Sequence, residues 1–295
     1  MKIGITGATG LIGSALAPAL RTEGHEVVRF LRSPVSAVND RRWDGVHLAP
    51  EAVADLDAVV HLAGAGVGDK RWTSSYKKLV LDSRVNGTAA VAQAVATAGT
   101  PVLLSASAVG WYGDTGDTLT DESGTRGRGF LADVCSAWEA ATAPADGKAR
   151  VVHLRTGIVL SARGGALHKQ LPIFKAGLGA PLGTGKQWLS WISLADEVAA
   201  ISHLLTADTA GPVNLVGPAP VTNKDFTKEL GKVLHRPTAP IAVPGFVLKG
   251  VLGQFADEGV LTGQRLAPSV LTASGFTFAH PDLRSALEAG LDEKP

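Results

Sequence analysis

The chain begins with Met1-Lys-Ile-Gly-Ile-Thr-Gly-Ala-Thr-Gly-Leu-Ile-Gly13, a short apolar segment that runs into three glycines spaced three residues apart. An amphipathic stretch that ends at Gly24 follows. The first of the three glycines permits a sharp turn out of a strand, the second lets the backbone approach a pyrophosphate, and the third lets a helix pack closely on the sheet. The N-terminus of that helix presents free N–H groups and a partial positive charge to phosphates. The segment therefore predicts a dinucleotide-binding turn. The residues expected there are Gly7, Thr9, Gly10, Leu11, Ile12 and Gly13.

The end of the second predicted strand, His25–Arg32, indicates which dinucleotide binds. Sites that prefer NAD place an Asp or Glu about 20 residues after the glycines, where it binds the ribose 2′-hydroxyl. No acidic residue lies between Glu26 and Asp40, and Arg32, followed by Ser33, stands at the expected place. A guanidinium pairs with a 2′-phosphate through charge-assisted hydrogen bonds. We therefore predict NADP(H) as the cofactor, the alternative being that Arg32 is a solvated surface residue.

Composition and charge exclude several classes of partner. The 295 residues are 45% hydrophobic, carry a formal net charge of +1 without a basic run, and include one cysteine and eight histidines. Near-neutral charge argues against nucleic acid as the main partner. No apolar run reaches the roughly 18 residues of a membrane span, and no signal peptide precedes the first strand, so we expect a cytoplasmic protein without a membrane partner. One cysteine permits no internal disulfide, and the histidines lack metal-ligand spacing, so no metal site is expected.

Predicted strands and helices alternate along the chain. Further strands are expected at Asp57–Gly64, Pro101–Ser107, Arg150–Leu160 and Pro212–Val216, and helices at Ser83–Ala98, Phe130–Ala143 and Ala195–Thr206. This order predicts an α/β fold, a Rossmann-like doubly wound parallel sheet with ligands at the carboxyl ends of its strands. The alternation of strands and helices becomes less regular at Ala162–Gln187 and again after Gly217. We expect residues 1–160 and 188–216 to form the dinucleotide-binding domain, and residues 161–187 and 217–295 a smaller, mostly helical substrate lobe.

The G-x-x-G-x-x-G spacing, with Thr6 before it, resembles the extended and atypical short-chain dehydrogenase/reductase families. Such enzymes use a serine, and a tyrosine followed four residues later by a lysine that lowers its pKa, to exchange a proton while hydride moves. Ser107, at the end of a predicted strand, matches the serine, the alternative being a strand-end serine bonded to local backbone. The tyrosine–lysine pair is missing. Only Tyr76 and Tyr112 are present, and neither has a lysine four residues later.

On the helix that normally carries this pair, Leu131 takes the tyrosine position and Cys135 the lysine position. An acid or base must therefore come from elsewhere, and the candidates are Tyr112, Lys70, Asp133 and Glu139. Tyr112 joins Ser107 as a predicted catalytic residue. For Glu139 a helix-surface or inter-helix contact is the favoured interpretation, and for Cys135 inert packing is favoured over a reactive thiol.

Further blocks sharpen the resemblance. They are Asp69-Lys-Arg-Trp72, Ser83-Arg84, Ser105-Ala-Ser-Ala-Val-Gly-Trp-Tyr-Gly113, Phe130-Leu-Ala, Trp138-Glu139, Arg155-Thr-Gly-Ile-Val-Leu160, Gly164-Gly-Ala-Leu167, Trp188-Leu-Ser-Trp-Ile192, Arg236-Pro237 and Gly263-Gln264. Together they resemble the epimerase-family proteins of the atypical short-chain dehydrogenase group, over essentially the whole chain and including that family's C-terminal segment.

The resemblance implies NADP binding, with contacts at Arg32, Leu62, Ala63, Arg84 and Ile158. Independently, small residues at Leu62-Ala63-Gly64 let a nucleotide lie along the end of a strand. Arg84 either reaches a phosphate or is solvated. By analogy with extended dehydrogenases, the helices Ser83–Ala98 and Phe130–Ala143 would pair in a homodimer.

Three functions compete on this basis. The first is an NADP(H)-dependent oxidoreductase or epimerase that acts on a small-molecule substrate through Ser107 and another acid or base. The second is a catalytically silent NADP(H)-binding redox sensor or scaffold, which fits the missing tyrosine and lysine. The third, a nucleotide-sugar epimerase in the strict sense, predicts the Y-x-x-x-K motif that this sequence lacks.

Overall fold

Seven parallel strands form the central sheet of the computed structural model, which describes residues 1–32, 35 and 37–293. In spatial order the strands are β10 (Gly211–Leu215), β6 (Arg150–Thr156), β5 (Val102–Ala108), β4 (Ala58–His61), β1 (Lys2–Thr6), β2 (Glu26–Leu31) and β3 (Asp40–Arg42). The order runs outward in both directions from β1, so the chain changes direction between β1 and β4. In open parallel sheets, ligands bind at the carboxyl ends of the strands beside such a switch point. The predicted Rossmann-like fold class is confirmed.

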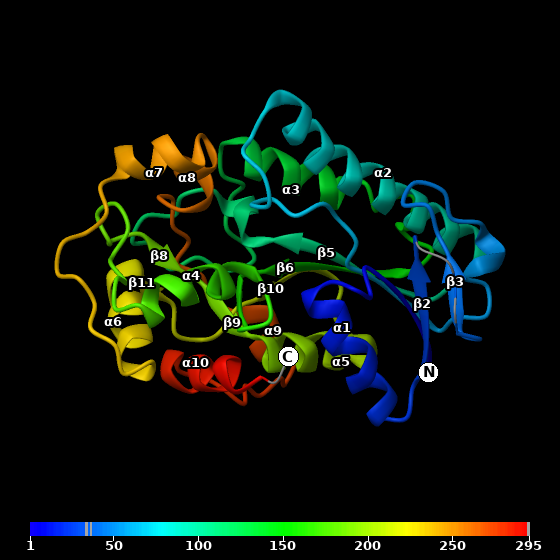
Figure 1. The fold of residues 1–295 in the computed structure, drawn as a ribbon. Helices are drawn as coiled ribbons and strands as arrows, with labels where there is room; N and C mark the ends of the chain where they lie inside the picture. The colour runs from blue at the N-terminus through cyan, green and yellow to red at the C-terminus, as the bar shows by residue number, and fades with distance from the viewer. Residues whose placement is uncertain (33–34, 36, 294–295) are drawn as a thin grey trace.

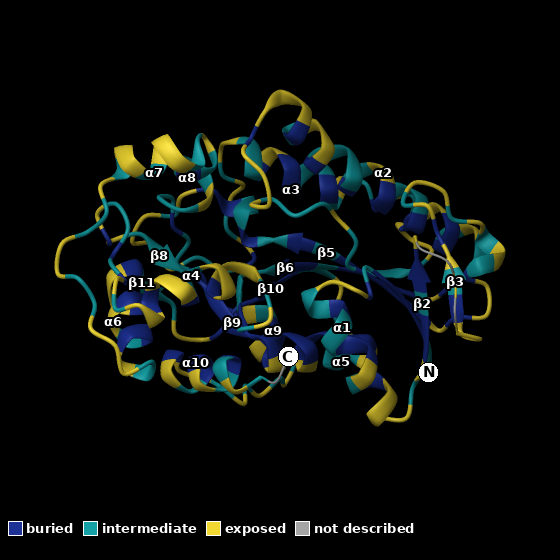
Figure 2. Ribbon diagram, viewed as in Figure 1, coloured by how far each residue is buried: buried dark blue, intermediate teal, exposed yellow. Residues whose placement is uncertain are grey.

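Helices cover both faces of this sheet (Figure 1). On one face lie α1 (Leu11–Thr22) and α5 (Leu194–Thr206), and on the other lie α2 (Ser74–Ala98) and α3 (Phe130–Ala140). The central strands are therefore apolar on both faces, and Figure 2 shows them as the buried middle of the molecule.

The observed elements differ most from the predicted ones in one helix and two strands. The helix expected from Ser83 is longer, because Thr73 caps it by accepting a hydrogen bond from the Tyr76 N–H. The strand expected over 150–160 is interrupted at Gly157, where a Cβ would lie 2.4 Å from the carbonyl oxygen of Ser190. After this break β7 (Ile158–Leu160) leaves the central sheet and pairs with β9 (Trp191–Ser193). The edge strand β3 was not predicted.

A second, mostly helical part covers the end of the sheet that carries β10 and β6, as predicted for the C-terminal region (Figure 1). Its elements are α4 (Gly165–Lys175), β8 (Trp188–Leu189), β11 (Val221–Thr222), α6 (Asn223–Val233), α7 (Gly245–Leu252), α8 (Phe255–Gly259) and α10 (Leu283–Asp292). Its core contains Phe174, Trp191 and Phe226. Lys169 of α4 donates a hydrogen bond to the carbonyl of Gly68, in the loop after β4, and so connects the two parts.

One segment of the predicted lobe packs elsewhere. Helix α9 (Ser269–Ala273) lies against β10, and Leu271 is fully buried in the core between the sheet and α1 and α5, with Phe276 and Phe278 packed beside it. The residues around α9 thus belong, by packing, to the dinucleotide-binding domain, because their apolar side chains complete its core. Conversely, β8 and Trp191 pack with the second part, although the prediction assigns residues 188–216 to the dinucleotide-binding domain. The divisions predicted at 160/161 and 216/217 stay predictions.

The described residues contain neither a membrane-spanning helix nor a cluster of metal-binding side chains. None of the helices in this part of the chain has the length and apolar character of a membrane span. Likewise, nowhere among these residues do three or more His, Cys, Asp or Glu side chains gather as metal ligands would.

Candidate functional site

The glycine turn between β1 and α1 is built without room for side chains. Gly7 has φ = 68°, and a Cβ there would lie 2.7 Å from the carbonyl carbon of Leu62, at the end of β4. A Cβ on Gly13 would lie 2.3 Å from the carbonyl oxygen of Gly7. Thr9 and Gly10 are exposed, while Leu11 and Ile12 are half-buried. The first N–H groups of α1 have no partner within the helix, so they are available to a phosphate at this turn.

A buried polar contact fixes β1 against β4 just below the turn. The hydroxyl of Thr6 lies 2.7 Å from Nδ1 of His61, and its oxygen also accepts the N–H of Leu62 at 3.2 Å. Burial lowers the pKa of His61 to about 4, so the imidazole is neutral at neutral pH. Sequence reasoning missed His61. The available signal was a polar residue that ends an otherwise apolar strand.

Arg84 of α2 lies beside the end of β4 and is not a solvated arginine. It is only 8% exposed, its guanidinium carbon lies 4.7 Å from the centre of the Trp138 ring, and Nη1 donates to the carbonyls of Ala65 and Val80. A Cβ on Gly64 would lie 3.4 Å from that guanidinium carbon. A cation is therefore held against the strand end at which a nucleotide is expected.

The other predicted cofactor residues surround the same edge of the sheet. Arg32 is exposed one residue after β2, and a Cβ on Gly45 would lie 3.9 Å from its Cδ. Ser33 lies outside the described residues. Ala63 is half-buried at the end of β4, and Ile158 is half-buried in β7, after the break in the strand. The glycine cradle, the helix N-terminus and Arg32 together match a dinucleotide that carries a phosphate on its ribose.

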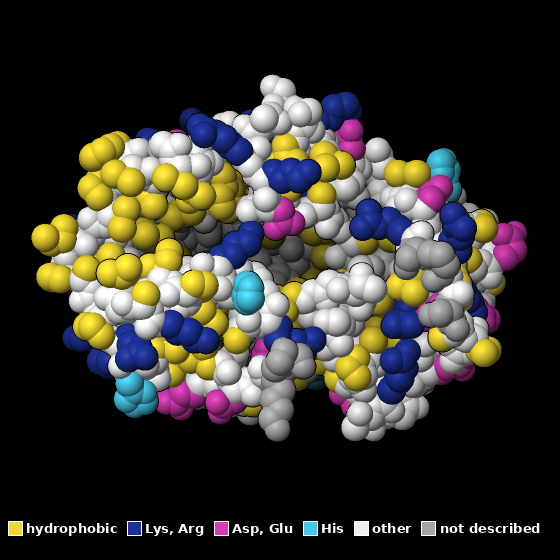
Figure 3. Space-filling model, in the orientation of Figure 1, with side chains coloured by type: hydrophobic (Ala, Val, Ile, Leu, Met, Phe, Trp, Pro, Cys, Tyr) yellow, Lys and Arg dark blue, Asp and Glu magenta, His cyan; other side chains and the backbone are white. Residues whose placement is uncertain are grey.

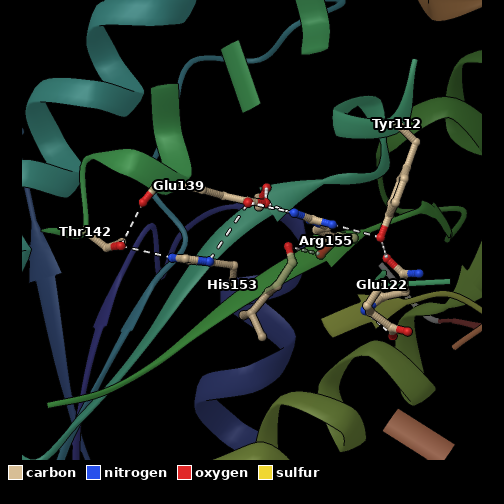
Figure 4. A network of polar contacts seen from close by, with 10 residues as sticks. Tyr112, Glu122, Glu139, Thr142, His153 and Arg155 are labelled. Atoms are coloured by element: carbon tan, nitrogen blue, oxygen red, sulfur yellow. Dashed lines mark hydrogen bonds and ion pairs between the residues drawn. The ribbon is translucent and has the colours of Figure 1, made fainter. Parts of the chain in front are cut away.

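A network of polar side chains that includes Glu139, Arg155 and Tyr112 lies at the ends of β5 and β6 (Figure 4), and the serine predicted from the sequence joins it. Ser107 is 3% exposed, and its hydroxyl donates a hydrogen bond of 2.6 Å to Oε1 of Glu139, on α3. Arg155 of β6 holds the same carboxylate with two bonds, from Nε at 2.8 Å and from Nη2 at 2.9 Å. The register pairs Ser107 with Arg155 across β5 and β6. The Ser107 hydroxyl therefore binds a side chain from another element, and not the local backbone that the alternative interpretation named.

Tyr112 lies at the far end of this network. Its hydroxyl donates to Asn214 Oδ1 at 2.8 Å and accepts from Arg155 Nη1 at 2.9 Å, and the residue is 2% exposed. Burial raises the pKa of Tyr112, although the bond from Arg155 works against this. The backbone N–H of Asn214 in turn donates to Glu122. In this position Tyr112 connects β6 to β10, and its catalytic role stays a prediction.

The positions of the missing tyrosine and lysine are filled by close packing. A Cβ on Gly110 would lie 3.4 Å from Cβ of Leu131 and 3.7 Å from Sγ of Cys135. Cys135 is buried, and burial raises the pKa of its thiol to about 12. Such a thiol stays protonated and inert, which supports the packing interpretation.

The remaining acid or base candidates separate clearly. Lys70 is exposed in the loop after β4, and Asp133 is exposed on α3 in an ion pair with Arg126. Glu139, which was interpreted as a surface or inter-helix contact, is the candidate that directly contacts Ser107. Arg155, its partner, was not identified as a site residue, although it opens one of the sequence blocks quoted above.

A second buried carboxyl group lies near the end of β6. Glu197 of α5 is fully buried, and its Oε1 accepts a 2.8 Å hydrogen bond from Thr156, while Oε2 has no partner among the described residues. Burial raises the pKa of Glu197 to about 8. The carboxyl group is therefore mostly protonated at neutral pH. The sequence offered no signal for this, because a glutamate in the first turn of a helix is ordinarily solvated.

Comparisons with known proteins agree with this geometry. Residues 3–217 match the model of the "NAD dependent epimerase/dehydratase family", and residues 243–289 match a domain of unknown function, DUF1731. An epimerase family protein of Mycobacterium bovis, Mb2239, is 46% identical over 289 residues, which cover 97% of this chain and 96% of the relative. The chloroplastic SDR39U1 homologue of Arabidopsis thaliana is 37% identical over 302 residues, covering 98% and 86%.

Two solved structures are similar over the whole chain. The human epimerase family protein SDR39U1, solved with NADPH, has a TM-score of 0.88 and 31% identity, covering 98% of each chain. A nucleoside-diphosphate sugar epimerase from Corynebacterium glutamicum has a TM-score of 0.82 and 36% identity over 98% of this chain and 58% of the other. With its glycine turn, its fold and relatives that match along its whole length, the chain belongs to the NAD dependent epimerase/dehydratase family.

Proposed function

We propose that this protein is an NADP(H)-dependent oxidoreductase or epimerase in which Ser107 and Glu139 exchange the proton that tyrosine and lysine exchange in related enzymes. The observation that carries the proposal is the 2.6 Å hydrogen bond from the Ser107 hydroxyl to the Glu139 carboxylate, at the carboxyl edge of the sheet. The substrate is a small molecule with a hydroxyl or carbonyl group.

The cofactor part of the proposal rests on the glycine turn, on Arg32 and on the family. The human relative, SDR39U1, was solved with NADPH. When bound, NADP(H) supplies the hydride acceptor or donor. The chain itself provides the N–H groups of the α1 N-terminus for the pyrophosphate, and Arg32 for the 2′-phosphate.

The direction of the Ser107 hydrogen bond determines what this residue offers a substrate. Because the Ser107 proton points to Glu139, the Ser107 oxygen presents a lone pair and accepts a hydrogen bond. An alcohol bound there donates its O–H proton to the Ser107 oxygen, while Ser107 passes its own proton to Glu139. In the reverse direction Glu139 returns the proton through Ser107 to an alkoxide. Proton transfer by positioned groups of this kind contributes about 10²–10⁴-fold to a rate.

Arg155 orients the base in this arrangement. Its two bonds fix both oxygens of Glu139, and its guanidinium carbon lies 3.7 Å from the centre of the Trp111 ring, so the guanidinium is held on its other side as well. A bidentate pair of this type leaves the carboxylate little rotational freedom. The Ser107 hydroxyl therefore has one well-defined acceptor.

A second candidate function is favoured by a separate observation. Leu131 and Cys135 fill the tyrosine and lysine positions with apolar packing, and Ser107 is only 3% exposed. Both features fit a catalytically silent NADP(H)-binding redox sensor or scaffold. The predicted homodimer through α2 and α3 would serve either function, and these two helices pack against each other within one chain.

Activity measurements on three variants separate the two functions. NADPH consumption over a panel of carbonyl compounds, and NADP⁺ reduction over the matching alcohols, should be followed with the parent protein, Ser107→Ala and Glu139→Gln. We expect both variants to bind NADPH with unchanged affinity and to lose at least 100-fold in turnover. Ser105→Ala is the matched control, because Ser105 is buried on the same strand and its hydroxyl has no partner among the described residues. Full turnover by Glu139→Gln would contradict the proton transfer, and NADPH binding with no turnover on any substrate would favour the silent function.

A further inference from the structure

The end of β2 has a basic neighbour that sequence reasoning did not identify. The parallel register pairs Arg29 with Asp40 and Leu31 with Arg42, so the last residue of β3 lies beside the last residue of β2. Arg32 follows Leu31 directly. Paired residues on adjacent strands are about 5 Å apart, so Arg42 and Arg32 start from neighbouring strand ends at the edge of the sheet where the nucleotide is expected.

The side of the sheet on which Arg42 lies follows from strand alternation. Side chains of paired residues point to the same face, so Arg42 shares a face with Arg29 and Asp40. Val27, two residues before Arg29, packs in the core with α1. Arg42 therefore lies on the α1 side of the sheet, and α1 is the helix whose N-terminus receives the pyrophosphate. A ribose at the end of β2 would be reached from this side.

Charges on β2 and β3 are matched in pairs except at this end. Arg29 binds Asp40 through two bonds of 2.8 and 2.7 Å, and Arg41 binds Asp55 through two bonds of 2.7 Å. Arg42 is exposed, and no acidic side chain of the described residues lies within ion-pair distance of it. Figure 3 shows Lys and Arg side chains gathered over this end of the molecule, around β2 and β3.

One carboxylate follows Arg42 closely in sequence, but it is directed elsewhere. Asp44 accepts the backbone N–H groups of Val46 and His47 at 2.8 and 2.7 Å, and its second oxygen lies 3.0 Å from Nδ1 of His47. The carboxylate thus closes its own turn. Gly45 in the same turn lies beside the Arg32 side chain, since a Cβ on Gly45 would be 3.9 Å from Cδ of Arg32.

We infer that Arg42 is a second guanidinium for the cofactor's 2′-phosphate, and that it shares this phosphate with Arg32. The inference rests on the proposed NADP(H) binding. Two arginines from adjacent strand ends contact one dianionic group, whereas the hydroxyl of NAD(H) at the same place gains nothing from either cation. Selectivity for NADP(H) therefore comes from both strand ends, and Arg42 contributes to it without touching any reacting atom.

Calorimetric titration with two fragments tests this without any turnover. 2′,5′-ADP carries the ribose phosphate in question, and 5′-ADP lacks it. Each is titrated into the parent protein, Arg42→Ala, Arg32→Ala and the double variant. A charge-assisted contact of this kind corresponds to about a tenfold loss of affinity. We expect Arg42→Ala and Arg32→Ala each to lose that factor for 2′,5′-ADP, and neither to lose more than about twofold for 5′-ADP.

Two controls keep the outcomes separate. Arg236→Ala removes an exposed arginine of the substrate lobe and should leave both affinities unchanged. Thermal unfolding of each variant shows that β3 still forms. If Arg42→Ala binds 2′,5′-ADP as the parent does while Arg32→Ala does not, the inference is wrong and the cofactor proposal stands. If the parent binds NADPH and 2′,5′-ADP no better than NADH and 5′-ADP, the proposed NADP(H) preference itself fails.

Discussion

The buried carboxyl group of Glu197 makes the stability of this protein depend on pH, and Glu197→Gln should remove that dependence. In the folded protein burial raises the pKa of Glu197 to about 8, from an ordinary value of 4.5. Between these two pH values the unfolded chain has released the proton and the folded chain retains it. Holding the proton costs about 1.4 kcal/mol for each pH unit above 4.5, or about 3 kcal/mol at pH 7. The ionisation of Glu197 therefore lowers the free energy of unfolding as pH rises from 4.5 to about 8, and this contribution is constant at higher pH.

Urea unfolding of the parent protein and of Glu197→Gln at intervals from pH 5 to pH 9 measures this effect. We expect the difference in unfolding free energy to grow in favour of the variant with pH and then to level off near pH 8. Other titrating groups, such as His61, whose pKa burial lowers to about 4, are present in both proteins and cancel. Glu229→Gln is the control, because the hydrogen bonds from Lys232 and Arg284 lower the pKa of Glu229 and keep it ionised throughout. A difference that stays constant across the range would refute the reasoning, since it would mean that Glu197 ionises as an ordinary glutamate does.

Four further substitutions test other parts of the structure. Gly13→Ala should weaken NADPH binding at least tenfold and lower stability by about 1–3 kcal/mol, because its Cβ meets the turn at 2.3 Å. In contrast, Gly250→Ala, in open space on α7, should raise stability by about 0.5–1 kcal/mol in the same unfolding assay. Arg155→Met should cost about 3–5 kcal/mol, because Glu139 is left as a buried charge without its partner, and a cost below 1 kcal/mol would show that the pair is solvated. Tyr112→Phe should cost about 1–3 kcal/mol and leave turnover intact if Tyr112 only connects β6 to β10, whereas loss of turnover at unchanged stability would support its predicted catalytic role.

The elements that the sequence predicted correctly are those with a local physical cause. The strand before Gly7 is apolar, Gly7 has a positive φ, and a Cβ on Gly10 or Gly13 would press on the backbone of Gly7, so the turn was visible in thirteen residues. The strand β3 was invisible because its sequence is Asp-Arg-Arg. Asp40 binds Arg29 of β2, and Arg41 binds Asp55. Nothing in the local sequence shows that these charges will be neutralised.

In the site as well, the sequence predicted features with a local cause and missed features that depend on distant parts of the chain. Ser107 was found because it ends a strand at the expected edge. The contacts of Glu139 were not predicted, because they depend on Arg155, 16 residues later on another element, and on the register that places Arg155 beside Ser107. Likewise, Arg84 left two interpretations open, and its burial against Trp138 excludes the solvated one, while the phosphate contact stays a prediction. Burial and partners that come from distant parts of the chain were the missing information in each case.

The packing of α9 also constrains how the chain can be made. Leu271 and Phe276 pack in the core next to β10, yet in the sequence they follow β10 only after α6, α7 and α8. During synthesis the dinucleotide-binding domain therefore keeps an open apolar groove until α9 has also emerged from the ribosome. A fragment that stops before residue 243, where the second family match begins, would retain the glycine turn and still expose that groove. We expect such a fragment to aggregate or to need a chaperone. The segment of unknown function thus contributes to the stability of the dinucleotide-binding domain, because its α9 completes that domain's core.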